Sequence, residues 1–118
     1  PIYVAATRGV DHNYVLDGPE DGEELRRAAR VTSHRSDTAL EVWTNRPGLQ
    51  VYTGNFLDGS TVSRRGTALR QGDGLALEPQ FFPDSPNRSA FPSAVLRPGE
   101  TSRCVIEYRF AASGRTAV

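Results

Sequence analysis

Apolar and polar residues alternate with a period of two in several short segments of this chain. In the clearest case, from Thr101 to Phe110, Cys104, Ile106 and Tyr108 alternate with Arg103, Val105 and Glu107. A period of two places every second side chain on the same face of an extended strand. Related patterns predict further strands over residues 2–6, 25–33, 38–44, 49–53 and 75–81.

Segment 25–33 also admits a helical turn, because it is rich in arginine and alanine. We favour a strand there, since Ala29, Val31 and Ser33 would then share one face. Short strands joined by glycine and proline turns, with no sustained helical period, predict an all-β fold. The expected architecture is an antiparallel β-sandwich.

Glycine and proline mark where the strands end. Asn45-Arg46-Pro47-Gly48 predicts a tight turn, and with it a hairpin between segments 38–44 and 49–53. Residues 60–74 are polar and are expected to form a loop, and residues 82–92 are proline-rich and irregular. Taken alone, Asp11-His12-Asn13 is typical of a turn in which a short polar side chain bonds to the backbone.

Composition limits the classes of function. With 118 residues the chain is long enough for one domain, and its 14 basic and 14 acidic residues balance to a formal net charge of zero. No charge excess favours nucleic acid or a membrane surface, and no transmembrane or signal-like apolar run is present. Cys104 is the single cysteine, which excludes an internal disulfide and favours a reducing, cytoplasmic location.

Glu78 stands out in the predicted strand at 75–81, among Leu75, Leu77 and Phe81. Glutamate is uncommon in strands, and a glutamate among apolar neighbours loses hydration, which favours its use as a proton acceptor. The alternative is that Glu78 lies on a solvated face opposite the two leucines. Pro79 follows at once and predicts an edge strand or a bulge.

Three longer segments together resemble the C-terminal part of the galactose mutarotase (aldose 1-epimerase) family. They are Gly9 to Tyr14, Leu40 to Gly59 and Leu75 to Asn87, followed by Phe91-Pro92 and Leu96 to Glu100. The resemblance extends over about residues 9–110 and implies a galactose mutarotase-like β-sandwich. It implies that residues 1–118 form the C-terminal part of a single aldose 1-epimerase domain whose N-terminal part is missing.

The resemblance implies interconversion of the α and β anomers of free aldohexoses such as galactose and glucose, with no cofactor and no metal. Glu78 matches the glutamate that takes a proton from the anomeric hydroxyl, and Asp11 and Gln50 match residues that hold sugar hydroxyls. The family's general-acid histidine lies in an upstream His-x-Tyr-Phe-Asn-Leu motif that this chain lacks, and neither His12 nor His34 matches it. We therefore expect the chain alone to be inactive, with unprotected strand edges and exposed apolar surface.

Two alternatives remain open at this stage. One is a non-catalytic carbohydrate-binding module on the same sandwich, although an intact Glu78 weighs against it. The other is a hexose-6-phosphate 1-epimerase, in which Arg64, Arg65 and Arg70 would hold the phosphate, whereas residues 47–50 and 54–59 look more like the free-sugar branch. These arginines lack interleaved aromatic residues, so nucleic acid is not an expected partner.

Overall fold

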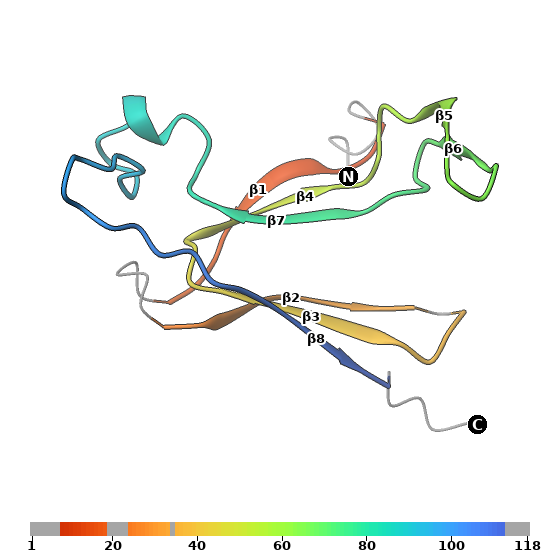
Figure 1. The fold of residues 1–118 in the computed structure, drawn as a ribbon, viewed down its shortest axis with the longest axis horizontal. Coiled ribbons are helices and arrows are strands. Elements are labelled where there is room, and N and C mark those ends of the chain that lie inside the picture. The colour runs from red at the N-terminus through yellow and green to blue at the C-terminus, as the bar shows by residue number, and fades with distance from the viewer. Residues whose placement is uncertain (1–7, 19–23, 34, 113–118) are drawn as a thin grey trace. The chain divides into compact units, whose positions relative to one another are not determined.

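A computed structural model describes residues 8–18, 24–33 and 35–112 (Figure 1). The predicted segment 2–6, the acidic stretch 19–23, His34 and residues 113–118 lie outside the described residues. The elements in chain order are β1 Asp11–Val15, β2 Arg26–Thr32, β3 Ala39–Thr44, β4 Gly48–Tyr52, β5 Asp58–Val62, β6 Ala68–Arg70, β7 Ala76–Gln80, the short 3-10 helix η1 Ser85–Asn87, and β8 Ile106–Ala111.

The strands form three sheets with the orders β1-β4-β7, β2-β3-β8 and β5-β6. Strand β3 pairs antiparallel with both β2 and β8, and β5 pairs antiparallel with β6. The predicted all-β class with antiparallel pairing is confirmed. Segment 25–33 is a strand, as favoured over the helical turn, and β2 carries a bulge between Arg27 and Ala29.

The described chain divides into two compact units. The first contains residues 8–14 and 49–78, and therefore most of β1, β4 and β7 together with the β5-β6 hairpin. The second contains the other described residues, including the β2-β3-β8 sheet. The fully buried apolar side chains are few: Ala39, Val42 and Leu49 are each at most 2% exposed.

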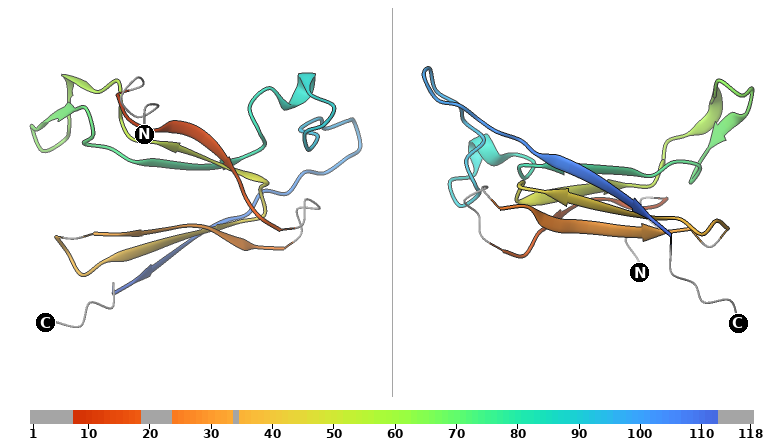
Figure 2. Two further views of the ribbon diagram at one scale, coloured as in Figure 1. Left: turned by 180° about the vertical axis from the view of Figure 1, so that it is seen from behind. Right: turned by 60° about the horizontal axis from the view of Figure 1, so that its bottom comes forward.

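The β2-β3-β8 sheet of the second unit has one charged face, and Figure 2 shows its strands from two directions. On this face Glu41 accepts hydrogen bonds from Trp43 Nε1 at 3.1 Å and from Arg27 at 3.0 Å, and Arg109 lies 4.1 Å above the Trp43 ring. The hydrogen bond from Trp43, with the nearby arginines, lowers the pKa of Glu41. The charged face is therefore held by a connected set of polar contacts.

Apolar side chains alternate with these charged ones along β8. Ile106, Tyr108 and Phe110 pair across to Thr44, Val42 and Leu40 of β3. Phe110 is 74% exposed, and eleven large apolar side chains among the described residues are exposed in all. Three of these exposed side chains, Ile106, Tyr108 and Phe110, alternate along β8 and therefore lie on one face of it.

Asn45 connects the end of β3 to the segment that leads into β8. Its Nδ2 donates to Arg103 O at 3.0 Å, and its Oδ1 accepts from Val105 N at 2.9 Å. Thr44 Oγ1 donates to Val105 O at 3.0 Å. Asn45 is 6% exposed and Thr44 is fully buried, so two buried side chains supply hydrogen-bond partners to the part-buried backbone of Arg103 and Val105.

These contacts correct two predictions from the sequence. Segments 38–44 and 49–53 form no hairpin with each other, because β3 pairs with β2 and β8 whereas β4 belongs to the sheet with β1 and β7. The predicted strand at 101–110 begins only at Ile106, since the backbone before it bonds to the side chains of Thr44 and Asn45 instead of to a strand. The turn signature favoured pairing between residues 38–44 and 49–53. Instead, the Thr44 and Asn45 side chains join the end of β3 to the segment before β8.

Residues 60–74, predicted as a loop, contain most of the β5-β6 hairpin. Ser63 N donates to Thr67 O at 2.8 Å, Gly66 N donates to Ser63 O at 2.9 Å, and Gly66 has a φ of +77°, which closes the turn. The strands are polar and short and therefore show no apolar alternation. Arg70 pairs with Asp58 at one end of this hairpin, whereas Arg64 and Arg65 lie in the turn at the other end.

We predict that Asn45→Ala lowers the free energy of unfolding by about 1–3 kcal/mol, because it removes the side chain that bonds to the part-buried carbonyl of Arg103 and N–H of Val105. The measurement is urea denaturation of the protein. The matched control is Asn87→Ala, which removes a 2.6 Å bond to Asp84 from an exposed residue. This variant should lose less than about 0.5 kcal/mol. Equal losses in the two variants would show that the Asn45 contacts stabilise nothing.

Candidate functional site

The three residues expected to act on a sugar lie on three neighbouring strands of one sheet. Gln50 is on the central strand β4, Asp11 is on β1 and Glu78 is on β7 (Figure 1). All three belong to the first compact unit. Asp11-His12-Asn13 does not form the turn that its composition suggested, because it is the first part of β1. Pairing with β4 supplies the backbone partners that a turn would have supplied.

The start of β1 is fixed against β4 by a cluster around Val10. Thr53 N donates to Val10 O at 3.0 Å, Val10 N donates to Thr53 Oγ1 at 2.9 Å, and Asn55 Nδ2 donates to Val10 O at 3.1 Å. The Thr53 hydroxyl and Asn55 Oδ1 are 2.7 Å apart, and Asn55 is 4% exposed. Sequence reasoning missed both anchors, although each is a polar residue next to Gly54 at the end of a predicted strand.

Gly9 allows this cluster to close around the start of β1. Its φ of +151° lies in the region that favours glycine, and a Cβ at this position would collide with Asn55 Oδ1 and Thr53 Oγ1. The backbone that leads into Asp11 therefore approaches the two anchors more closely than any other residue would permit. The position of Asp11 depends on this close approach.

Asp11 and Gln50 are joined directly. Gln50 Nε2 donates to Asp11 Oδ1 at 2.7 Å, a short distance that fits a bond to a charged acceptor. The Gln50 Oε1 and Asn13 Oδ1 atoms are buried and have no hydrogen-bond partner. Because buried polar atoms are nearly always paired, two such oxygens next to each other mark an unusual polar region of the sheet. The pair offers both an acceptor and a donor group of fixed geometry.

Glu78 is exposed, with the half-exposed Ala76 and Gln80 two residues away on either side. The loss of hydration that the apolar neighbours suggested is therefore wrong for Glu78, and the alternative of a solvated face describes its exposure. Leu77 is partly buried, as alternation along a strand requires. Among the described residues β7 is an edge strand, where Pro79 costs no hydrogen bond to a further neighbour.

His12 is the one histidine in the described part of the chain. Its Nδ1 accepts a hydrogen bond from the backbone N–H of Asp11 at 3.2 Å. Alternation along β1 points the His12 side chain to the face opposite Asp11 and Asn13. The described residues thus bring together Asp11 and Gln50 and place Glu78 one strand away, and His12 does not join that face.

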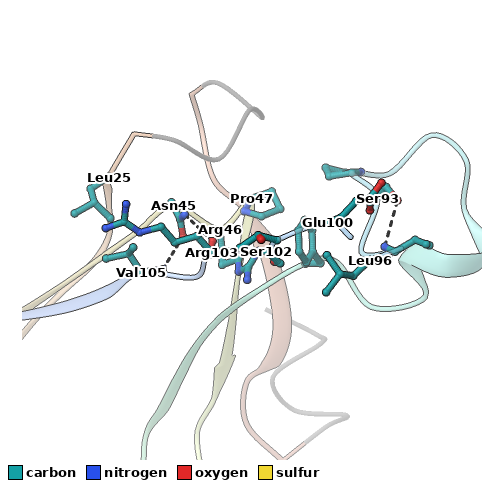
Figure 3. A pocket seen from close by; sticks show the side chains of 14 residues that line it. Leu25, Asn45, Arg46, Pro47, Ser93, Leu96, Glu100, Ser102, Arg103 and Val105 are labelled. Atoms are coloured by element: carbon teal, nitrogen blue, oxygen red, sulfur yellow. Dashed lines mark hydrogen bonds between the residues drawn. The ribbon is translucent and has the colours of Figure 1, made fainter. Parts of the chain in front are cut away.

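A groove of about 1000 Å³ lies elsewhere, in the second unit (Figure 3). Arg46 and Phe81 line it, with the Arg46 guanidinium 4.6 Å from the centre of the Phe81 ring. Its other lining residues come from the position before β2, from the turn after β3 and from the irregular segment before β8: Leu25, Asn45, Pro47, Pro92, Ser93, Val95, Leu96, Glu100, Thr101, Ser102, Arg103 and Val105. None of Asp11, Gln50 and Glu78 is among them.

Residues 8–18, 24–33 and 35–112 contain neither a metal-binding cluster nor a membrane-spanning helix. No group of three histidine, cysteine, aspartate or glutamate side chains has the geometry to hold a metal ion there. No helix among these residues is long and apolar enough to span a membrane.

Comparison with known proteins identifies the family of this chain. The model of the aldose 1-epimerase family matches residues 2–109. The chain belongs to this family.

Particular relatives agree with that assignment. Galactose mutarotase of Mus musculus is 43% identical over 103 residues, which cover 87% of this chain and 29% of the relative. Galactose mutarotase of Homo sapiens is 45% identical over 92 residues, which cover 78% of this chain and 26% of the relative. Aldose 1-epimerase of Escherichia coli (strain K12) is 43% identical over 107 residues, which cover 89% of this chain and 30% of the relative. The chain thus spans less than a third of the length of these relatives.

We predict that Gly9→Ala raises the KM of the full-length protein for the aldohexose that the family resemblance implies, because the added methyl group displaces the Val10 cluster and with it Asp11. The measurement is the concentration dependence of the reaction, beside thermal unfolding. The control is Gly66→Ala, which also requires a positive φ, +77°, but whose methyl group would meet nothing within 4 Å. It should lose about 1 kcal/mol of stability from backbone strain with KM unchanged. A KM that rises equally in both variants would mean that strain alone is responsible.

Proposed function

We propose that this chain is the C-terminal part of an aldose 1-epimerase domain, and that the full-length protein interconverts the α and β anomers of free aldohexoses such as galactose and glucose. Membership of the family supports the reaction class. The observation that carries the proposal is the 2.7 Å bond between Gln50 and Asp11 on the sheet that also carries Glu78. All three residues lie in the segments that resemble the family.

In the proposed reaction Glu78 accepts the proton of the anomeric hydroxyl while an acid donates a proton to the ring oxygen, and the C1–O5 bond breaks. The open aldehyde turns about the C1–C2 bond, and the reverse proton transfers close the ring from the other face. General acid–base catalysis of this kind needs no cofactor and no metal. The acid is a histidine outside these 118 residues, and the chain alone is therefore inactive.

Asp11 and Gln50 hold the sugar in this scheme. The Asp11 carboxylate accepts hydrogen bonds from hydroxyl groups, and the Gln50 amide both donates and accepts. Their mutual bond fixes the orientation of both side chains before the sugar arrives, which lowers the entropy lost on binding. Arg70 lies at the opposite end of the β5-β6 hairpin from Arg64 and Arg65, so the three arginines do not converge on one phosphate group. The free sugar is therefore the proposed substrate.

The proposed location is the cytoplasm. Cys104 is an exposed free thiol, which a reducing compartment preserves. The proposed partner is the small-molecule sugar alone.

Glu78→Gln tests the proposal, because glutamine has nearly the same shape and cannot accept the proton. In the full-length protein the variant should lose about 10²- to 10⁴-fold in kcat, the usual contribution of a general base. The measurement is polarimetry of freshly dissolved α-D-galactose, with the rate in buffer subtracted. Glu24→Gln is the matched control, since Glu24 is exposed and lies in the other unit.

The outcomes separate the competing functions. An active parent and control with an inactive Glu78→Gln variant support the mutarotase and the role of Glu78. A parent no faster than buffer that still binds galactose would instead support a carbohydrate-binding module. A Glu78→Gln variant as active as the parent would exclude Glu78 as the base.

A further inference from the structure

Two aromatic rings stand beside the polar pair in the first unit. Tyr52 follows Gln50 by two residues on β4, so the two side chains share one face of the strand. The Tyr52 and Phe56 rings are stacked, with centroids 6.4 Å apart and planes inclined by 22°. The two rings are therefore held beside each other in nearly parallel planes, and we call this pair the aromatic platform.

The same sheet face carries Asp11. Leu16 N donates to Pro47 O and Thr53 N donates to Val10 O, two bonds that give β1 and β4 antiparallel directions and one register. In this register Asp11 lies opposite Tyr52, and opposed side chains of paired strands are neighbours. Tyr52 is thus a neighbour of both hydroxyl-binding groups, and Phe56 extends the aromatic platform beyond the end of β4.

The outer ring of the platform is fixed although it is exposed. Phe56 is 78% exposed, yet its backbone N–H donates to the Tyr52 hydroxyl at 3.0 Å. On one side its neighbour Asn55 is buried, and on the other Leu57 N donates to Gly54 O at 3.2 Å in a turn where Gly54 has a φ of +67°. A large apolar ring that is held in place in contact with water is suited to a ligand.

A pyranose ring has the surface that matches this arrangement. Its hydroxyls project mainly around the rim, and its faces carry C–H bonds, which pack against the electron-rich face of an aromatic ring. Small-molecule sites commonly combine an apolar wall with a few convergent polar groups. Here the platform supplies the wall and the Asp11–Gln50 pair supplies the polar groups.

We propose that Phe56, held by Tyr52, stacks against the C–H face of the sugar while Asp11 and Gln50 bind its hydroxyls. The assignment rests on the proposed function, because it names a further substrate contact in the same site. It also specifies the kind of contact, which is between an aromatic ring and the C–H bonds on one face of a pyranose.

The test uses Phe56→Ala, Phe56→Leu and Phe56→Tyr in the full-length protein with galactose. Phe56→Ala should raise KM about threefold to tenfold, the range expected for loss of one aromatic stack, with kcat changed less than about twofold. Phe56→Leu keeps apolar bulk without a flat ring and should resemble Phe56→Ala, whereas Phe56→Tyr should keep the parent KM. The control Val62→Ala trims another exposed apolar side chain, 59% exposed, in the same unit and should leave KM unchanged.

A separate variant tests whether the Tyr52 hydroxyl positions Phe56. Tyr52→Phe keeps the ring and removes the hydroxyl that accepts from Phe56 N–H, so KM should rise less than in Phe56→Ala. When Tyr52→Phe is combined with Phe56→Ala, KM should stay at the value of Phe56→Ala alone. An unchanged KM in Phe56→Ala, with a lowered melting temperature, would overturn the assignment and show that another part of the full-length protein covers Phe56.

A binding measurement separates failure of this inference from failure of the proposed function. Saturation-transfer NMR from the aromatic protons to galactose C–H protons is recorded on Glu78→Gln, in which turnover does not interfere. Transfer that is lost in the Glu78→Gln, Phe56→Ala double variant supports stacking even if the parent shows no mutarotase activity. Active parent protein with equal transfer in the single and double variants would refute stacking and leave the proposed function intact.

Discussion

The interaction on which the candidate site depends is the pairing of β1 with β4 around Val10. Both backbone groups of Val10 bond to Thr53, and Asn55 adds a third bond from a buried side chain. This cluster closes only because Gly9 has no Cβ to collide with it. One residue further along, Asp11 is placed where Gln50 can donate to it. A backbone anchor thus fixes the two side chains that we propose to bind hydroxyl groups, and these side chains are themselves exposed or half-exposed, as a preorganised site would require.

Strand positions could be read from the sequence more reliably than strand partners. Period-two alternation located β3, β4 and β7, because alternation is a local property of a half-buried strand. The hairpin predicted at Asn45 to Gly48 was wrong, since the partners of β3 are set by long-range contacts that a turn signature does not encode. The β5-β6 hairpin was missed because polar strands show no alternation.

The site could be predicted from sequence only through the family resemblance. Hydration arguments alone misjudged Glu78, which is exposed, and composition alone favoured a turn for Asp11 to Asn13, which is a strand. The order β1-β4-β7 brings together three segments from distant parts of the chain, and no local pattern indicates that order. Thr53 and Asn55 were overlooked because their contacts with Val10 join segments that are far apart in the sequence.

The size of this sheet suits a single sugar ring. Neighbouring strands are about 4.8 Å apart, so β1 and β7 are separated by about 10 Å across β4, a distance close to the width of a pyranose with its hydroxyls. Ring opening needs a base and an acid on opposite sides of one C–O system. A ring that lies along one sheet face meets that face from one side only. In the proposed reaction Asp11 and Gln50 would bind the ring and Glu78 would accept its proton, and the proton for the ring oxygen would come from a group that approaches from the other side.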